Sequence, residues 1–128
     1  MERDARIRYK RLTENKGIAG NTNEAMTLAT GEWIALLDHD DILTPDALYE
    51  VVKAINEHPD AEAIYSDEDK VSMDLKTYFE PHFKSDFNPD LLRANNYICH
   101  LFAAKKELVD MQVDFAVNMT GHRILILS

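Results

Sequence analysis

Trp33-Ile34-Ala35-Leu36-Leu37-Asp38-His39-Asp40-Asp41 is the stretch that decides the fold of this chain. Its first five residues form a continuous apolar run, which is typical of a strand buried on both faces of a sheet. The run ends in three carboxylates within four residues. A strand that ends this way places several negative charges at one edge of a sheet, where open α/β sheets usually bind ligands.

The acidic loop, residues 38–41, carries more negative charge than a turn needs. Carboxylates this close repel one another unless a cation lies between them. Aspartates without a nearby thiolate suit Mg²⁺ or Mn²⁺, which keep positions open for phosphate oxygens. The alternative is a polar loop that caps the next helix, but Thr44 and Pro45 already form a good helix start. We therefore predict a metal–diphosphate site in which Asp40 binds the ion, and Asp38 shares it or accepts hydrogen bonds from a ribose.

Other polar residues are weaker candidates. Asp41 is expected to stiffen the loop, and His39 to face outward or lie beside the bound group rather than bind the ion. A second acidic stretch, Ser66-Asp67-Glu68-Asp69-Lys70, follows the next predicted strand, so we expect both acidic loops to face one crevice. Asp67 and Asp69 of that stretch, and Lys84 further along the chain, are candidates for contact with substrate or acceptor, or equally for a solvated surface.

Composition limits the classes of function. The chain has 128 residues, which suits one domain over residues 1–128, with residues 111–128 as an atypical tail. Its net charge of −9 argues against a nucleic-acid partner, because phosphate backbones need a basic surface. The single cysteine, Cys99, excludes an internal disulfide framework. Without an apolar signal region or spanning run, we expect a cytoplasmic protein; association with the inner face of a membrane stays open.

The order of predicted elements indicates an α/β fold. Alternating strands and helices imply a mixed, mainly parallel sheet flanked by helices. An unpaired edge of such a sheet could recruit a second copy, so a homo-oligomer also stays open. The final apolar run, residues 124–127, is an edge strand, a packed end or sequence from an altered reading frame. The predicted strands cover residues 7–12, 33–37, 61–65 and 98–104, and the predicted helices residues 22–30, 45–57, 88–93 and 105–109.

Five motifs, taken in order, resemble family 2 glycosyltransferases of the GT-A fold, in the rhamnosyltransferase-like branch. The resemblance covers roughly residues 6 to 110. The motifs are Glu14-Asn15-Lys16-Gly17-Ile18-Ala19-Gly20-Asn21-Thr22-Asn23, Ala29-Thr30-Gly31-Glu32 with the opening stretch, Tyr65-Ser66-Asp67-Glu68-Asp69-Lys70, Phe83-Lys84-Ser85-Asp86-Phe87 and Asn96-Tyr97-Ile98-Cys99-His100-Leu101.

This resemblance implies a Rossmann-like GT-A domain that binds a UDP or dTDP sugar and transfers the sugar with inversion to a carbohydrate acceptor. Asp38 and Asp40 would bind the ribose and a Mn²⁺ or Mg²⁺ ion, which acts as a Lewis acid on the diphosphate. The segment Asn15, Lys16 and Gly17 would lie near the nucleotide base, with His39 also at the nucleotide. A catalytic Asp or Glu would take the proton of the acceptor hydroxyl.

The sequence departs from the family pattern at both ends. It begins at about the third strand of the family fold, without the preceding nucleotide-binding unit. After residues 105–109 it lacks the acidic motif that carries the base; Asp110 and Asp114 are the acids present there. The alternative function is therefore a non-catalytic remnant that binds nucleotide and metal without transferring the sugar.

Overall fold

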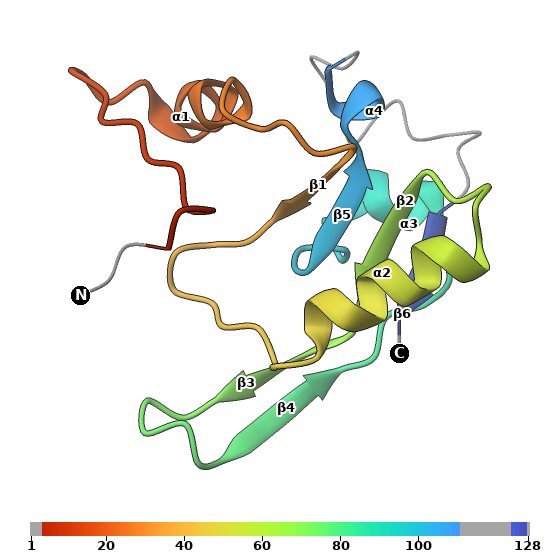
Figure 1. The fold of residues 1–128 in the computed structure, drawn as a ribbon. Coiled ribbons are helices and arrows are strands. Elements are labelled where there is room, and N and C mark those ends of the chain that lie inside the picture. The colour runs from red at the N-terminus through yellow and green to blue at the C-terminus, as the bar shows by residue number, and fades with distance from the viewer. Residues whose placement is uncertain (1–3, 111–123, 128) are drawn as a thin grey trace. The chain divides into compact units, whose positions relative to one another are not determined.

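The computed structural model describes residues 4–110 and the backbone of residues 124–127 (Figure 1). The chain divides into two compact units, residues 1–31 and 32–128. The elements are α1 (Gly17–Met26), β1 (Trp33–Leu36), α2 (Ala47–Glu57), β2 (Ala63–Ser66), β3 (Glu68–Val71), β4 (Tyr78–His82), α3 (Pro89–Ala94), β5 (Phe102–Lys105), α4 (Lys106–Asp110) and β6 (Ile124–Leu127).

The first unit holds one helix in its described part, residues 4–31. The predicted strand at residues 7–12 is wrong: a strand needs a partner for its backbone groups, and this described part offers none. Helix α1 begins earlier than the predicted residues 22–30. Gly17, at φ 73°, makes the turn into the helix, and its N–H donates to the side chain of Asn15 at 2.9 Å. Residues 17–21, which precede the predicted helix, are thus helical.

The second unit is built on a mixed sheet with strand order β1-β5-β2-β6. Strands β1, β2 and β6 run in one direction, and β5 runs against them. The predicted α/β class with a mixed sheet is therefore confirmed. Although most strands share a direction, only the β2–β6 pairing is parallel among the described pairs. The reason is that β5 lies between β1 and β2, which follow each other in the sequence but do not pair.

Helices cover both faces of this sheet, and alternate residues of β2 and β5 point to opposite sides. One face carries a cluster that packs against residues 87 and 92, before and within α3, and against α4: Ala63, Tyr65, Tyr97, Ile98, Phe102 and Ala104. The other face packs on α2 through Val51, Ala54, Ile64, Leu101 and Ala103. Both helix-covered faces are thus apolar, as the α/β class requires.

Several local predictions need correction. The run that starts at residue 33 is not buried on both faces, since Leu36 and Leu37 are 38% and 44% exposed. Among the described strands, β1 lies at the edge of the sheet and has one neighbour, β5. The N-cap of α2 is Asp46, not Thr44. Residues 68–71 and 78–82, for which no strand was predicted, form the antiparallel hairpin β3–β4. The end of the tail is an edge strand, β6, while Asp114 lies outside the described residues.

Candidate functional site

The acidic loop that follows β1 gathers three potential metal ligands. The N–H of Asp41 donates to the carbonyl oxygen of Asp38 at 3.2 Å, which closes a turn. His100 lies beside both acids: its Nε2 is 3.5 Å from Asp38 Oδ1, and its Nδ1 is 3.1 Å from Asp41 Oδ2. One ligand atom from each residue lies within 4.8 Å of the other two. The loop and the segment before β5 therefore form one cluster of two oxygens and one nitrogen.

The antiparallel register explains why these residues meet. Leu36, the last residue of β1, pairs with Phe102, the first residue of β5. Because the two strands run in opposite directions, continuing this register by two residues sets Asp38 opposite His100. The cluster is thus a direct extension of the β1–β5 pairing.

Asp40 and His39 lie on the solvent side of the same loop. The Asp40 side chain is 76% exposed, and its Oδ1 lies 3.9 Å from Nδ1 of His39, whose side chain is 98% exposed. Asp40 is outside the cluster of three, although it lines the same groove. Its role as a metal ligand, and that of His39 at a nucleotide, stay predictions.

A fully buried lysine holds the segment that carries His100. The Lys84 ammonium donates to the carbonyl oxygens of Ile98 and His100, both at 2.6 Å. It also lies 3.2 Å from Glu68 Oε2, and none of its side chain is exposed. Contact of Lys84 with a substrate stays a prediction; the structure gives its ammonium three internal oxygens.

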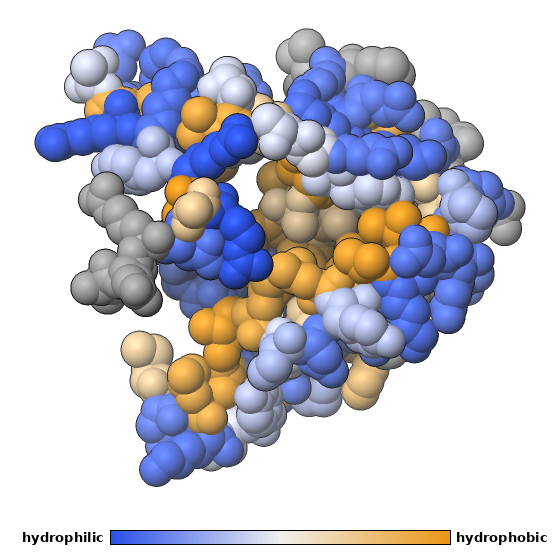
Figure 2. All heavy atoms as spheres, in the orientation of Figure 1, coloured by the Kyte–Doolittle hydropathy of each residue, from blue (hydrophilic) through white to orange (hydrophobic). Residues whose placement is uncertain are grey.

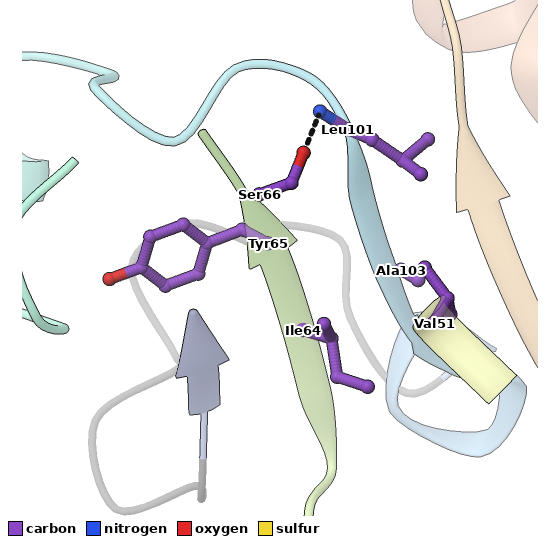
Figure 3. A pocket seen from close by; sticks show the side chains of 6 residues that line it. All are labelled: Val51, Ile64, Tyr65, Ser66, Leu101 and Ala103. Atoms are coloured by element: carbon purple, nitrogen blue, oxygen red, sulfur yellow. Dashed lines mark hydrogen bonds between the residues drawn. The ribbon is translucent and has the colours of Figure 1, made fainter. Parts of the chain in front are cut away.

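Strand β2 fixes the residue after His100. The hydroxyl of Ser66 accepts a hydrogen bond from the N–H of Leu101 at 3.2 Å (Figure 3). The N–H of Ser66 in turn donates to the carbonyl oxygen of Leu101 at 3.1 Å. The backbone on both sides of the His100 side chain is therefore held by side chains or backbone of other elements.

An open groove runs past the cluster. Its volume of about 1050 Å³ is slightly above the usual range for ligand pockets. Both acidic loops line it, so the prediction that they face one crevice is confirmed. Apolar side chains extend from the hairpin toward the sheet on this side of the unit, bordered by hydrophilic ones (Figure 2). The acids that line the groove are Asp40, Asp41, Asp46, Glu50, Asp67, Glu68, Asp69 and Glu80.

The second acidic loop leads into β3, and its Asp67 contacts the segment that follows β4. Asp67 Oδ1 accepts a hydrogen bond from the backbone N–H of Lys84 at 2.7 Å, whereas Asp69 is exposed. Burial raises the pKa of Glu68, but the hydrogen bond with His82 and the charge of Lys84 outweigh burial and leave that pKa lowered. Substrate contacts of Asp67 and Asp69 stay predictions.

The predicted base-binding segment belongs to the first unit. Asn15 Oδ1 accepts hydrogen bonds from the Gly17 N–H and, at 3.0 Å, from Asn21 Nδ2. Lys16 pairs with Glu24 at 2.6 Å. The role of Asn15, Lys16 and Gly17 near a nucleotide base is not tested by these contacts.

His100 is the residue that sequence reasoning missed. It stood in one of the five motifs, but no local pattern connects it with an acidic loop so far away in the chain. Only the register of β5 against β1 would have revealed the contact.

Among the described residues, no helix has the length and apolar character to cross a membrane.

Comparison with known proteins agrees with this fold. The chain matches the model of glycosyl transferase family 2 over residues 1–111, and it belongs to that family. Family membership implies the GT-A fold. The chain is therefore a glycosyltransferase-like domain.

Two curated relatives match most of the chain. It is 49% identical over 98 residues to the uncharacterised protein y4gI of Sinorhizobium fredii, covering 77% of this chain and 11% of that protein. It is 35% identical over 107 residues to the O-antigen biosynthesis protein RfbC of Myxococcus xanthus, covering 83% of this chain and 8% of that protein. The chain thus spans about a tenth of the length of these relatives.

Proposed function

We propose that this chain binds the diphosphate of a UDP or dTDP sugar through a divalent ion at the acidic loop. It would be the donor-binding part of a glycosyltransferase that transfers the sugar with inversion to a carbohydrate acceptor. The observation that carries the proposal is the convergence of Asp38, Asp41 and His100 at the edge of one large groove.

The charge of the groove requires a cation for this function. Among the residues that the structure describes, eight acidic side chains line it, against one lysine, Lys70, and two histidines. A diphosphate brings further negative charge, which such a surface would repel. A divalent ion between the loop and the diphosphate removes this conflict, because it attracts both.

The donor set fits such an ion. Carboxylate oxygens suit Mg²⁺ and Mn²⁺, and one imidazole nitrogen is compatible with Mn²⁺. Asp38 and Asp41 would hold the ion; exposed Asp40 would bind it or the ribose hydroxyls. When bound, the ion acts as a Lewis acid that stabilises the leaving diphosphate.

The rest of the groove suits the sugar and the acceptor. Asp69 is exposed at its wall, where its carboxylate could accept hydrogen bonds from sugar hydroxyls. Apolar side chains that line the same groove, such as Phe79 of β4 and Leu75, would supply a surface for an apolar sugar face. Association with a membrane surface or a second copy remains a separate prediction.

Calorimetry tests the proposal directly. Titrating UDP or dTDP into the chain with Mn²⁺ should release heat, and chelation of the ion should abolish it. Asp38→Ala and Asp40→Ala should each weaken binding by at least tenfold, as loss of a ligand or its close support does. Glu107→Ala, which removes an exposed carboxylate of α4 outside the groove lining, is the matched control and should bind normally. Equal heats for all these variants would defeat the site.

A further inference from the structure

We propose that His100 is a nitrogen ligand of the divalent ion and gives this site a preference for Mn²⁺ over Mg²⁺. The inference rests on the proposed function, because it concerns the same ion. It adds His100, which lies outside the acidic loop, to the ligands of that ion, and it states which of the two cations the site prefers. Its support comes from spacing, from the anchoring of the His100 segment and from ligand chemistry.

The spacing allows one ion to lie between His100 and the acids, since one candidate ligand atom from each of the three residues lies within 4.8 Å of the other two. Neighbouring ligand atoms about 2.1 Å from an octahedral metal lie about 3 Å from each other. The two ring nitrogens of His100 lie 3.1 Å and 3.5 Å from carboxylate oxygens of Asp41 and Asp38. One nitrogen can bind the ion while a carboxylate accepts from the other, an arrangement common for metal-binding histidines.

The anchoring is independent of the acidic loop. Burying the ammonium of Lys84 is costly, and it is offset only where good partners exist. Two of these partners are the carbonyl oxygens of residues 98 and 100, so the buried charge fixes the backbone that carries His100. Ser66 fixes the next residue, Leu101. A ligand held this firmly loses little conformational freedom on binding an ion.

The cation preference follows from the mixed donor set. Mg²⁺ demands oxygen ligands in nearly ideal octahedral geometry and keeps several waters. Imidazole nitrogen suits the transition metals more, and affinity for nitrogen-containing sites rises along the first-row series that starts at Mn²⁺. A site that combines carboxylate oxygens with one imidazole nitrogen therefore favours Mn²⁺, whereas the same loop without His100 would discriminate little.

Pulsed EPR of the Mn²⁺-loaded chain tests this inference without any activity measurement. We expect a ¹⁴N coupling from a bound imidazole in the native chain and its loss in His100→Asn and His100→Gln. His58→Asn is the control, because His58 is exposed at the end of α2 and is not part of the groove lining. That variant should keep the coupling.

Competition with Mg²⁺, followed by the EPR signal of free Mn²⁺, gives the second measurement. His100→Asn should weaken Mn²⁺ binding by about tenfold or more and leave Mg²⁺ binding nearly unchanged. If Mn²⁺ binds without a ¹⁴N coupling, and if Asp38→Ala abolishes that binding, the role of His100 is overturned and the proposed function still stands. No saturable Mn²⁺ binding in the native chain would overturn both. Unchanged fluorescence of Trp33 in each variant confirms that it is folded.

Discussion

Replacing Lys84 by Met tests how much the buried ammonium contributes to the second unit. The change removes two hydrogen bonds from a charged donor, at 2.6 Å each, and leaves the carbonyl oxygens of Ile98 and His100 without it. A buried acceptor left unsatisfied costs about 1–3 kcal/mol. Two of them cost about 2–6 kcal/mol, while Met, of similar length, avoids the desolvation cost of the ammonium.

Glu68 adds little to this sum. Its side chain is 35% exposed and keeps its contact with His82 at 3.1 Å, so water and that ring compensate for the lost lysine. We therefore expect Lys84→Met to lower the free energy of unfolding by about 2–6 kcal/mol, the cost of the two unsatisfied carbonyl oxygens.

Urea unfolding followed by fluorescence measures this loss. Trp33 is the only tryptophan of the chain and packs against the core cluster on the α2 face, so its emission reports on the second unit. Lys70→Met is the matched control: the Lys70 side chain is 64% exposed, its ion pair with Glu80 lies at the surface, and we expect at most about 0.5 kcal/mol. A loss below about 1 kcal/mol for Lys84→Met would refute the reasoning.

Three further changes have outcomes that the same unfolding assay can measure. Tyr65→Phe removes the hydroxyl that donates to the Ser85 carbonyl at 2.6 Å and should cost about 1–2 kcal/mol; no loss would contradict that bond's contribution. Ile64→Ala, at a side chain 1% exposed, should cost about 2–5 kcal/mol, whereas Val52→Ala, at 54% exposure, should cost less than about 0.5 kcal/mol. Because the folded-state pKa of Glu68 is lowered, its ionised form stabilises the fold above its unfolded pKa, and this contribution is lost as pH falls through the folded pKa. The Glu68→Gln variant should therefore lose less stability than the native chain as the pH falls below about 4.5. Parallel pH profiles of the free energy of unfolding for the two proteins would contradict this prediction.

The sequence predicted elements whose signal is local. The apolar positions of α2 recur with the helical period, and α2 forms at Ala47–Glu57. Asn88 followed by Pro89 predicted the start of α3, and the Asn88 side chain accepts from the N–H groups of residues 90 and 91. In both cases neighbouring residues determine the structure, so a sequence pattern suffices.

Elements that depend on distant partners were harder to predict. The hairpin β3–β4 contains charged residues and a proline, and its strands are stabilised by pairing with each other rather than by an apolar pattern. Residues 7–12 have a strand-like alternation but find no partner strand in the described part of their unit. Alternation therefore indicates that a segment is able to form a strand, whereas the presence of a partner strand determines whether the strand forms.

Of the candidate site, the acidic loop could be predicted from the sequence, whereas the contribution of His100 could not. Asp38 follows an apolar run, so its position at a strand end could be read from neighbouring residues. His100 precedes β5, and its position depends on β5 entering the sheet next to β1 in the opposite direction. Had β5 run parallel to β1, residues before β5 would lie at the other end of β1, away from the acidic loop. Strand β5, the reversed strand among those described in this mixed sheet, is thus what brings a nitrogen to the carboxylates.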